Sequence, residues 1–229
     1  MGTAARLVNH FLDPRSGLAR TIRLITPASG WKLIVASYSK ALRTYGRPYY
    51  PGETARSRAR RMREGFFEKF TQGNGLDIGY GGDPIVPGVQ GWDLEHGDAQ
   101  RLRDLADNSF DFVYASHTLE HMVDVEDALR NWWRVVKPGG YCIIAVPDRD
   151  LYEKKRTLPS HFNSDHKHFF LLDRDEAPDT IGVVPLIQHT LSNCEIIYAK
   201  RCSEEHTIDD PARHSDGEYQ IEAVMRKQE

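Results

Sequence analysis

Cysteine is scarce in this sequence of 229 residues, which contains only Cys142, Cys194 and Cys202. These three show neither a CxxC spacing nor an even count, which argues against a disulfide framework and a zinc knuckle. The chain also lacks an apolar run approaching the roughly 20 residues of a membrane span, and its first residues lack the apolar core of a signal peptide. These absences predict a protein of a reducing compartment, the cytoplasm.

Charge is unevenly distributed along the chain. The net charge of -3 combines a strongly basic segment, residues 1–70, with an acidic remainder. The basic segment can face a phosphate-bearing substrate, nucleic acid or an anionic membrane surface, or it can pack on the acidic part of the same chain. The content of 40% hydrophobic and 28% charged residues is typical of a folded globular protein.

The N-terminal residues differ in pattern from the rest. Short apolar-periodic pieces are separated by prolines and glycines, which predicts a few short helices. We therefore predict a helical N-terminal lid or extension over residues 1–53 and a main domain over residues 54–229. The amphipathic stretch 31–42 can cover an active site, lie on a membrane surface or pack on the core. Tyr49 and Tyr50 lie in a loop, and we expect them to contact substrate.

Residues 54–70 have the apolar spacing of one long helix. Met62, Phe66 and Phe70 belong to its apolar face, and arginines between positions 56 and 63 cover the remaining surface. Such a basic run is typical of a solvated helix face, and nucleic-acid binding is the less favoured interpretation. The helix leads into a first strand.

A glycine-rich stretch, residues 74–83, follows. Its apolar run contains Asp77 and ends in three glycines within four positions, which predicts a buried strand over 75–79 and a loop whose backbone a ligand can approach. Prolines and a glycine then leave room only for a short crossover before the second strand, residues 89–94. In nucleotide-binding parallel sheets an acid at this strand end, here Asp93, accepts hydrogen bonds from ribose hydroxyls.

The later pattern alternates strands with a helix. Further strands are expected over residues 110–116, 141–146, 195–201 and 218–227. An amphipathic helix over 123–136 separates the first two of them, which indicates a doubly wound α/β sheet, and the last two suit an antiparallel terminal pair. Residues 148–180 form a long loop rich in histidine and charge, which is typical of a functional loop.

Six motifs occur in a fixed order between residues 75 and 140. They are Gly75-Leu76-Asp77-Ile78-Gly79-Tyr80-Gly81, Asp93, Gly97-Asp98-Ala99, Phe110-Asp111-Phe112-Val113-Tyr114, Leu119-Glu120-His121 and Val136-Lys137-Pro138-Gly139-Gly140. With these motifs the chain resembles the class I S-adenosylmethionine-dependent methyltransferases over residues 75–147. The resemblance implies a Rossmann-like sheet of seven strands with an antiparallel last strand, and S-adenosylmethionine as the cofactor. The short crossover after the glycine loop departs from the family pattern.

The resemblance also implies which residues hold the cofactor. They are Asp77, Gly79, Tyr80, Gly81, Asp93, Leu94, Asp98, Ala99 and Ser116. The first glycines of the loop and Asp77 would surround the methionine part, Asp93 would hold the ribose hydroxyls, and Asp98 and Ala99 would contact the adenine ring. Ser116 and His117 would line the junction between cofactor and methyl acceptor.

A hydroxyl acceptor needs a group that removes its proton, and histidine has a pKa suited to this task near neutral pH. His117 follows a strand end, where sites in such sheets lie. In the long loop, His166 or His168 is a candidate base oriented by Asp165; alternatively these three residues bind a divalent metal ion. We favour the base and predict no metal site, because hard-metal sites use more carboxylates. His121 is expected to cap or orient its own turn.

The predicted activity is methyl transfer from S-adenosylmethionine to a hydroxyl of a small polar molecule. Asp148 and Arg149, directly after the strand 141–146, are expected to meet this acceptor, and Arg149 suits a phosphate or carboxylate on it. Similarity of the loop 165–168 to methyltransferases of polysaccharide and glycosylated natural-product pathways indicates a sugar or glycosylated acceptor. The alternatives are an RNA methyltransferase and a module that binds the cofactor without catalysis; the glycine spacing disfavours a nicotinamide enzyme.

Overall fold

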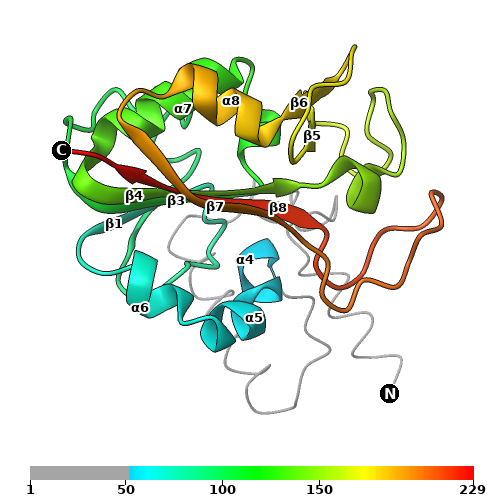
Figure 1. The fold of residues 1–229 in the computed structure, drawn as a ribbon, viewed down its shortest axis with the longest axis horizontal. Coiled ribbons are helices and arrows are strands. Elements are labelled where there is room, and N and C mark those ends of the chain that lie inside the picture. Colours follow the sequence, from blue (N-terminus) through cyan, green and yellow to red (C-terminus); the bar gives the residue numbers. More distant parts are fainter. Residues whose placement is uncertain (1–51) are drawn as a thin grey trace, which may run out of the picture. The chain divides into compact units, whose positions relative to one another are not determined.

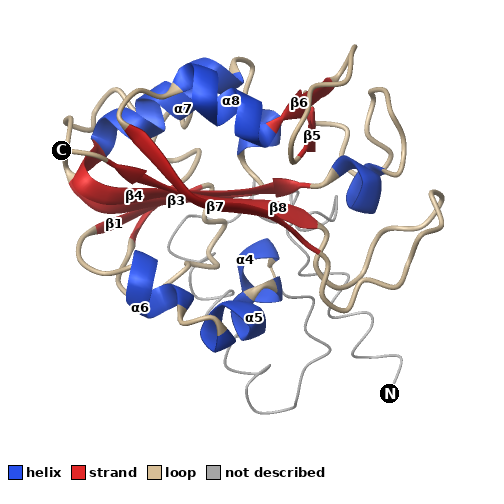
Figure 2. Ribbon diagram, in the orientation of Figure 1, coloured by secondary structure: helices blue, strands red, loops and turns tan. Residues whose placement is uncertain are grey.

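The computed structural model describes residues 52–229, in which helices pack on both faces of a central sheet (Figures 1 and 2). The strands of this sheet are β1 (Gly75–Ile78), β2 (Gln90–Trp92), β3 (Phe110–Ser116), β4 (Val136–Pro147), β7 (Cys194–Cys202) and β8 (Gln220–Lys227). The helices are α4 (Glu53–Arg56), α5 (Arg58–Arg63), α6 (Phe66–Phe70), α7 (Val125–Val135) and α8 (Val183–Thr190). The predicted helices of residues 1–50 and the predicted lid lie outside the described residues.

The strand order is β2-β1-β3-β4-β8-β7. Strands β2, β1, β3 and β4 run parallel, and β8 is antiparallel to both of its neighbours, β4 and β7. The predicted α/β sheet with an antiparallel last strand is therefore confirmed. A seventh strand is not found in this sheet within residues 52–229; residues 97–109, between β2 and β3, form turns instead.

Strand β3 shows how one sequence pattern builds two cores. Val113 and Ala115 pack in the cluster on the side of α7 and α8, whereas Phe112 and Tyr114 pack on the other face against Phe66 of α6. Successive side chains of a strand point to opposite faces, so a continuously apolar strand requires cover on both. Figure 1 shows this cover, with α7 and α8 on one face of the sheet and α4, α5 and α6 on the other.

The prediction of one long helix over residues 54–70 is wrong, because these residues form three short helices, α4, α5 and α6. Gly65 separates α5 from α6 with a φ of +64°, a left-handed conformation that ends a helix and that glycine adopts without strain. Ser57 lies between α4 and α5, and its hydroxyl donates to the Glu218 carboxylate at 2.9 Å. Met62, placed on the apolar face by the prediction, is 66% exposed.

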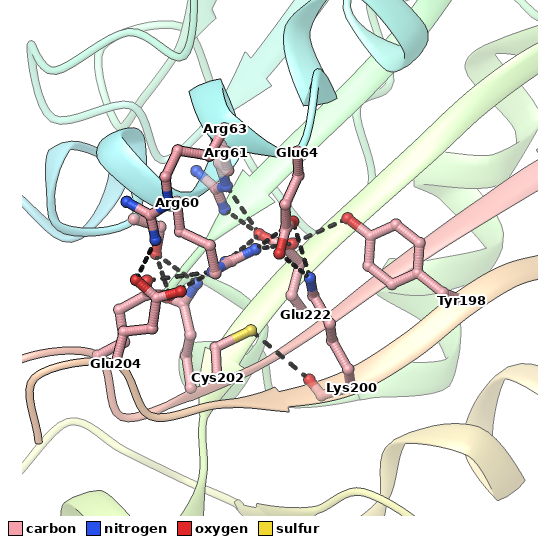
Figure 3. Close-up of polar contacts among 12 residues, drawn as sticks. Arg60, Arg61, Arg63, Glu64, Tyr198, Lys200, Cys202, Glu204 and Glu222 are labelled. Carbon is pink, nitrogen blue, oxygen red and sulfur yellow. Dashed lines mark hydrogen bonds and ion pairs between the residues drawn. The ribbon is translucent and has the colours of Figure 1, made fainter.

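The arginines of this segment do not form the predicted solvated face. Arg60 and Arg61 are buried, and both donate to the buried carboxylate of Glu222 on β8 (Figure 3). Arg60 Nε also donates to Glu218, and Arg61 Nη1 donates to the Tyr114 hydroxyl on β3 at 2.8 Å. The helices on this face are therefore joined to the sheet by buried charge as well as by apolar packing. Sequence spacing could not show this, because the partners lie about 160 positions away.

The predicted loop over residues 148–180 contains regular structure. A π-helical turn, η2 (Arg149–Glu153), follows β4 directly, and Asp148 caps it by accepting from the Asp150 and Leu151 amides. Later in the segment β5 (Phe169–Leu171) pairs in parallel with β6 (Thr180–Gly182). Phe169, Phe170 and Leu171 are buried, so apolar burial orders a stretch whose polar neighbours suggested an irregular loop.

No helix among residues 52–229 combines the length and apolar character required to cross a membrane.

Replacing Glu222 by glutamine should destabilise the protein by about 3–5 kcal/mol, because two buried guanidinium groups lose the charge that compensates them. Burial by itself would raise the pKa of Glu222, but the charges and hydrogen bonds of Arg61 and Arg60 lower it to about 2. Urea unfolding at neutral pH measures the change. The control is Glu204→Gln, which affects an exposed pair with Arg63 and should cost less than about 1 kcal/mol. Equal losses in the two variants would contradict the role assigned to Glu222.

Candidate functional site

The site lies at the edge of the sheet where the parallel strands end. The chain passes from β1 to β2 on one side of β1 and then returns to β3 on the other side, which makes the edge between β1 and β3 a topological switch point. Ligands of open α/β sheets bind in the crevice at such a point. The residues that follow β1, β2 and β3 are Gly79, Asp93 and His117, so the register brings three predicted site residues to one edge.

The glycine loop after β1 has an open backbone. Gly79, Gly81 and Gly82 are exposed and have φ values of +71°, +54° and +82°. At Gly79 a Cβ atom would lie 2.2 Å from the Thr118 hydroxyl oxygen, so this position requires glycine for space as well as for conformation. The Gly81 amide donates to the Asp93 carboxylate at 3.2 Å, which joins the loop to the end of β2.

Asp77 lies on β1 just before the glycine loop, and its side chain is buried beneath that loop's crossover to β2. Its side chain is 1% exposed, and Oδ2 accepts from the Ile85 amide at 2.7 Å. This bond holds the short crossover, which contains no helix, as the prolines predicted. Burial raises the pKa of Asp77 to about 7, the like charge of Asp83 adds to the rise, and the Ile85 hydrogen bond opposes it. The carboxyl group is therefore balanced between its neutral and charged forms near neutral pH.

The predicted ribose and adenine residues follow β2 in an exposed turn. Asp93 Oδ1 accepts from the Leu94 amide at 2.9 Å, and the Leu94 side chain is 93% exposed. Asp98 is exposed and accepts from the Gln100 amide, whereas the Ala99 carbonyl accepts from the Trp132 indole at 2.8 Å. A carboxylate beside an exposed apolar side chain is an arrangement that can hold a ribose and the face of a base.

Ser116 and His117 end β3 at the same edge. His117 has a φ of +51°, and its Nε2 lies 3.2 Å from Gln220 Oε1 and 3.8 Å from Glu53 Oε2. Burial lowers the pKa of His117 to about 4, against the opposing charge of Glu53 and the hydrogen bond that the ring donates to Gln220 Oε1. The imidazole is therefore neutral at neutral pH, and burial makes it a weaker base than an ordinary histidine. Ser116 is buried, and Thr118 Oγ1 bonds its carbonyl oxygen at 3.1 Å.

A buried acid and histidines lie directly behind His117. Glu120, in the helical turn η1 (Leu119–His121), is 0% exposed, and burial raises the pKa of its carboxyl group well above the ordinary value. Its Oε1 lies 3.6 Å from His117 Nδ1, 4.0 Å from His121 Nε2 and 3.9 Å from His166 Nε2. The segment after β4 therefore brings His166 to the end of β3, as the prediction of a functional loop requires.

The predicted partners within the loop are arranged differently. Asp165 accepts from His121 Nδ1 at 3.0 Å and from Lys167, and it does not orient His166 or His168. Glu153 of η2 takes that place for His166, with Nδ1 and Oε1 2.8 Å apart. His168 Nε2 lies 3.1 Å from the Met122 carbonyl oxygen. The prediction was wrong because His121, which we expected only to cap its own turn, reaches the segment after β4 and takes Asp165 as its partner.

Asp148 and Arg149 have structural partners within the described chain. Asp148 is buried, caps η2 and lies 3.1 Å from Arg201 Nε. Arg149 is 3% exposed, and its guanidinium bonds Glu176 and Asp150. These contacts hold the segment after β4, which is a different role from the predicted contact with acceptor. Tyr49 and Tyr50 lie outside the described residues.

Sequence reasoning missed Glu120 and Glu153 as members of the site. In the sequence Glu120 stands out only as part of a family motif, although an acid between Leu119 and His121, four residues after a strand end, is a usable signal. Glu153 offers no such signal, because its place beside His166 depends on η2 folding back over the sheet edge.

Comparison with known proteins agrees with this geometry. Residues 74–144 match the family model of a methyltransferase domain. The structure is similar to an S-adenosylmethionine-dependent methyltransferase of Thermotoga maritima, described as a possible histamine N-methyltransferase, with 19% identity, a TM-score of 0.50, and coverage of 86% of this chain and 98% of that chain. An S-adenosylmethionine-dependent methyltransferase of Aquifex aeolicus gives 14% identity and a TM-score of 0.43 over 81% of this chain and 96% of the other. No curated protein matches in sequence.

The structure therefore has a Rossmann-like fold in which residues 74–144 match a methyltransferase domain, and these findings support S-adenosylmethionine as the cofactor. The matched segment includes the glycine loop, Asp93 and Glu120, and it ends within β4. Neither the domain nor the fold identifies the methyl acceptor, because one fold serves many substrates.

Asp77 should contribute a fall in the free energy of unfolding as pH rises from about 4 to about 7, and the lowered pKa of His117 gives an opposing contribution in the same interval. The folded state keeps the Asp77 proton up to a pKa of about 7, whereas the unfolded chain releases it near the ordinary value of 3.8. The Asp77→Asn variant should lack this contribution, which is on the order of 4 kcal/mol across the interval. Urea unfolding at pH 5 and pH 7.5 measures it. An Asp104→Asn control, at an exposed acid, should keep the wild-type slope; an unchanged slope in Asp77→Asn would contradict the assignment.

Proposed function

We propose that this protein transfers a methyl group from S-adenosylmethionine to a hydroxyl of a small polar acceptor, a sugar or glycosylated intermediate, with His117 as the general base. The observation that carries the proposal is the position of neutral His117 at the end of β3, at the same sheet edge as the exposed glycine loop. The acceptor class is supported by the many carboxyl and imidazole groups at this edge, which suit a polyhydroxylated molecule.

The residues present fit the cofactor. The exposed backbone of Gly79 and Gly81 lets a ligand approach closely, Asp93 offers a carboxylate for ribose hydroxyls, and Leu94 offers an exposed apolar surface for the adenine ring. When bound, S-adenosylmethionine supplies a methyl group activated by its sulfonium. Since methyl transfer is a direct displacement, alignment of acceptor and methyl by these fixed groups accounts for much of the rate.

His117 would take the hydroxyl proton. Because its Nε2 donates to Gln220 Oε1, the nitrogen that can take the proton is Nδ1, and Glu53, 3.8 Å from Nε2, places a negative charge beside the imidazolium that forms. His166 and His168 are less suited to this role, because they lie on the segment after β4 with Glu153 and the Met122 carbonyl oxygen as partners, whereas His117 directly follows β3 at the sheet edge. Of the predicted bases, the proposal therefore retains His117, and it does not depend on Asp165.

The RNA methyltransferase alternative loses its main support. Its evidence was the arginine run of residues 56–63, yet Arg60 and Arg61 are buried with Glu222 and Arg63 pairs with Glu204. Arg56 pairs with Glu53, and Arg58 donates to the carbonyl oxygens of Pro84 and Ile85. Guanidinium groups engaged within the domain do not form a free basic surface for phosphates.

The Asp93→Ala variant should bind S-adenosylhomocysteine about 10- to 100-fold more weakly than wild type, because a carboxylate that bonds Gly81 and the ribose hydroxyls is lost. Calorimetric titration measures the affinity, and NAD serves as a ligand that neither protein should bind. The matched control is Glu95→Ala, which removes a neighbouring exposed acid and should bind as wild type. Unchanged affinity in Asp93→Ala would show that the cofactor does not sit at the end of β2.

The His117→Asn variant should lower kcat about 100- to 10,000-fold while S-adenosylhomocysteine binding stays within twofold of wild type. The acceptor is first identified by a mass-spectrometric screen for methylated products among nucleotide sugars, glycosides and small phenols. The control is His189→Asn, at an exposed histidine paired with Glu126. Full turnover by His117→Asn would refute the base assignment, and binding of cofactor with no product from any acceptor would favour the noncatalytic module.

A further inference from the structure

Three metal-ligating side chains converge behind the end of β3. Glu120, His121 and His166 each present one ligand atom, and these atoms all lie within 4.8 Å of one another. Glu120 Oε1 is 4.0 Å from His121 Nε2 and 3.9 Å from His166 Nε2. In a tetrahedral site with bonds of about 2.1 Å the ligand atoms stand about 3.4 Å apart, so binding an ion would contract the two Glu120 distances by about half an ångström and the distance between the histidine nitrogens by up to about 1.4 Å.

Glu120 lacks the hydrogen bonds that a buried carboxyl group requires. Its side chain is 0% exposed, and neither carboxylate oxygen has a hydrogen-bond partner among residues 52–229. A buried polar group without partners is costly, and buried charges are normally paired or bound to metal. Glu120 Oε1 faces the Nε2 atoms of His121 and His166 as well as His117 Nδ1 at 3.6 Å, and a cation between Glu120, His121 and His166 would give this oxygen and the two Nε2 atoms a partner.

Both histidines are held with the free ring nitrogen toward Glu120. His166 Nδ1 lies 2.8 Å from Glu153 Oε1, and His121 Nδ1 lies 3.0 Å from Asp165 Oδ2. Histidine ligands of metals typically donate their other N–H to a carboxylate, which fixes the tautomer and raises the basicity of the ligating nitrogen. This pattern occurs twice in the cluster, and it is unnecessary for histidines that only pack.

The two segments that supply the ligands are also fixed to each other. The Lys167 amide donates to the Glu120 carbonyl oxygen at 2.8 Å, and Lys167 Nζ donates to the His121 carbonyl oxygen at 2.8 Å. The ligands therefore come from a rigid junction between η1 and the segment after β4. A preorganised set of this kind is what a metal site needs in order to bind tightly.

We propose that Glu120, His121 and His166 bind a divalent ion of the zinc class, with Glu153 and Asp165 orienting the histidines. Two imidazoles and one carboxylate leave a fourth position for water, as in catalytic zinc sites, whereas magnesium and calcium prefer all-oxygen ligand sets. The sequence pattern alone favoured no metal, because the candidate set of Asp165, His166 and His168 has too few carboxylates for a hard-metal site; this set did not include Glu120. This inference stands apart from the proposed methyl transfer, since the ion binds without cofactor or acceptor.

Metal binding is tested on the full-length protein without a histidine tag. After removal of metals by a chelator, dialysis against zinc with elemental analysis should give one tightly bound ion per chain. Cobalt(II) should produce visible absorption bands of a four- or five-coordinate nitrogen and oxygen site, without a thiolate charge-transfer band, and zinc should abolish them. Magnesium should not compete. Absence of bound zinc and of cobalt bands in the wild-type protein overturns the proposal by itself.

Variants locate the ion. Glu120→Gln, His121→Asn and His166→Asn should each lower zinc affinity by at least about 100-fold, and Glu153→Gln should lower it by about 10- to 100-fold. His189→Asn is the matched control, because this exposed histidine also has a carboxylate partner, Glu126, and it should bind zinc as wild type. Thermal unfolding without metal confirms that each variant is folded, and His121, 24% exposed, tolerates substitution best.

Wild-type affinity in Glu120→Gln and His121→Asn would place the zinc elsewhere and overturn the proposal. The outcome is separable from that of the proposed function, because zinc binding and S-adenosylhomocysteine binding are measured independently. A protein that binds zinc at Glu120 and yet methylates no acceptor would keep the metal site and lose the proposed activity.

Discussion

The buried ion pairs between Arg61, Arg60 and Glu222 are the interaction on which the rest of the structure depends. They join α5 to β8, and the Tyr114 hydroxyl extends the network to β3. The two buried guanidinium groups and the buried carboxylates of Glu222 and Glu218 are stable only as a complete set, so helices and sheet must assemble together. At the start of β8, Gln220 links the helices to the site, because it contacts both the Ser57 hydroxyl and His117.

Titratable groups are concentrated at the edge of the sheet where the parallel strands end. The glycine loop, the end of β2 and the end of β3 meet at a switch point that the strand order creates. Asp77 and Glu120 are both buried there, and burial raises the pKa of each carboxyl group. Groups perturbed in this way cluster at functional sites, and here they lie beside the glycine loop that we propose holds the cofactor.

Much of the fold could be read from local patterns. The apolar runs of β1, β3 and β4 and the prolines after the glycine loop predicted their elements, because strand burial and proline geometry are local constraints. The break of residues 54–70 into three helices was missed, since Gly65 within an otherwise helical pattern can be tolerated or can end the helix. Burial of Arg60 and Arg61 was missed for a different reason: their partners on β8 are remote in sequence.

The sequence by itself determined the glycine loop, the acid Asp93 after the second strand and the order of the sheet's main elements, and these led to a methyltransferase domain that uses S-adenosylmethionine. Only the tertiary structure decided which histidine meets which carboxylate: His121 with Asp165, His166 with Glu153, and Glu120 between them. The physical reason is that side-chain pairing across a sheet edge depends on how separate segments fold over it, and sequence distance does not encode this.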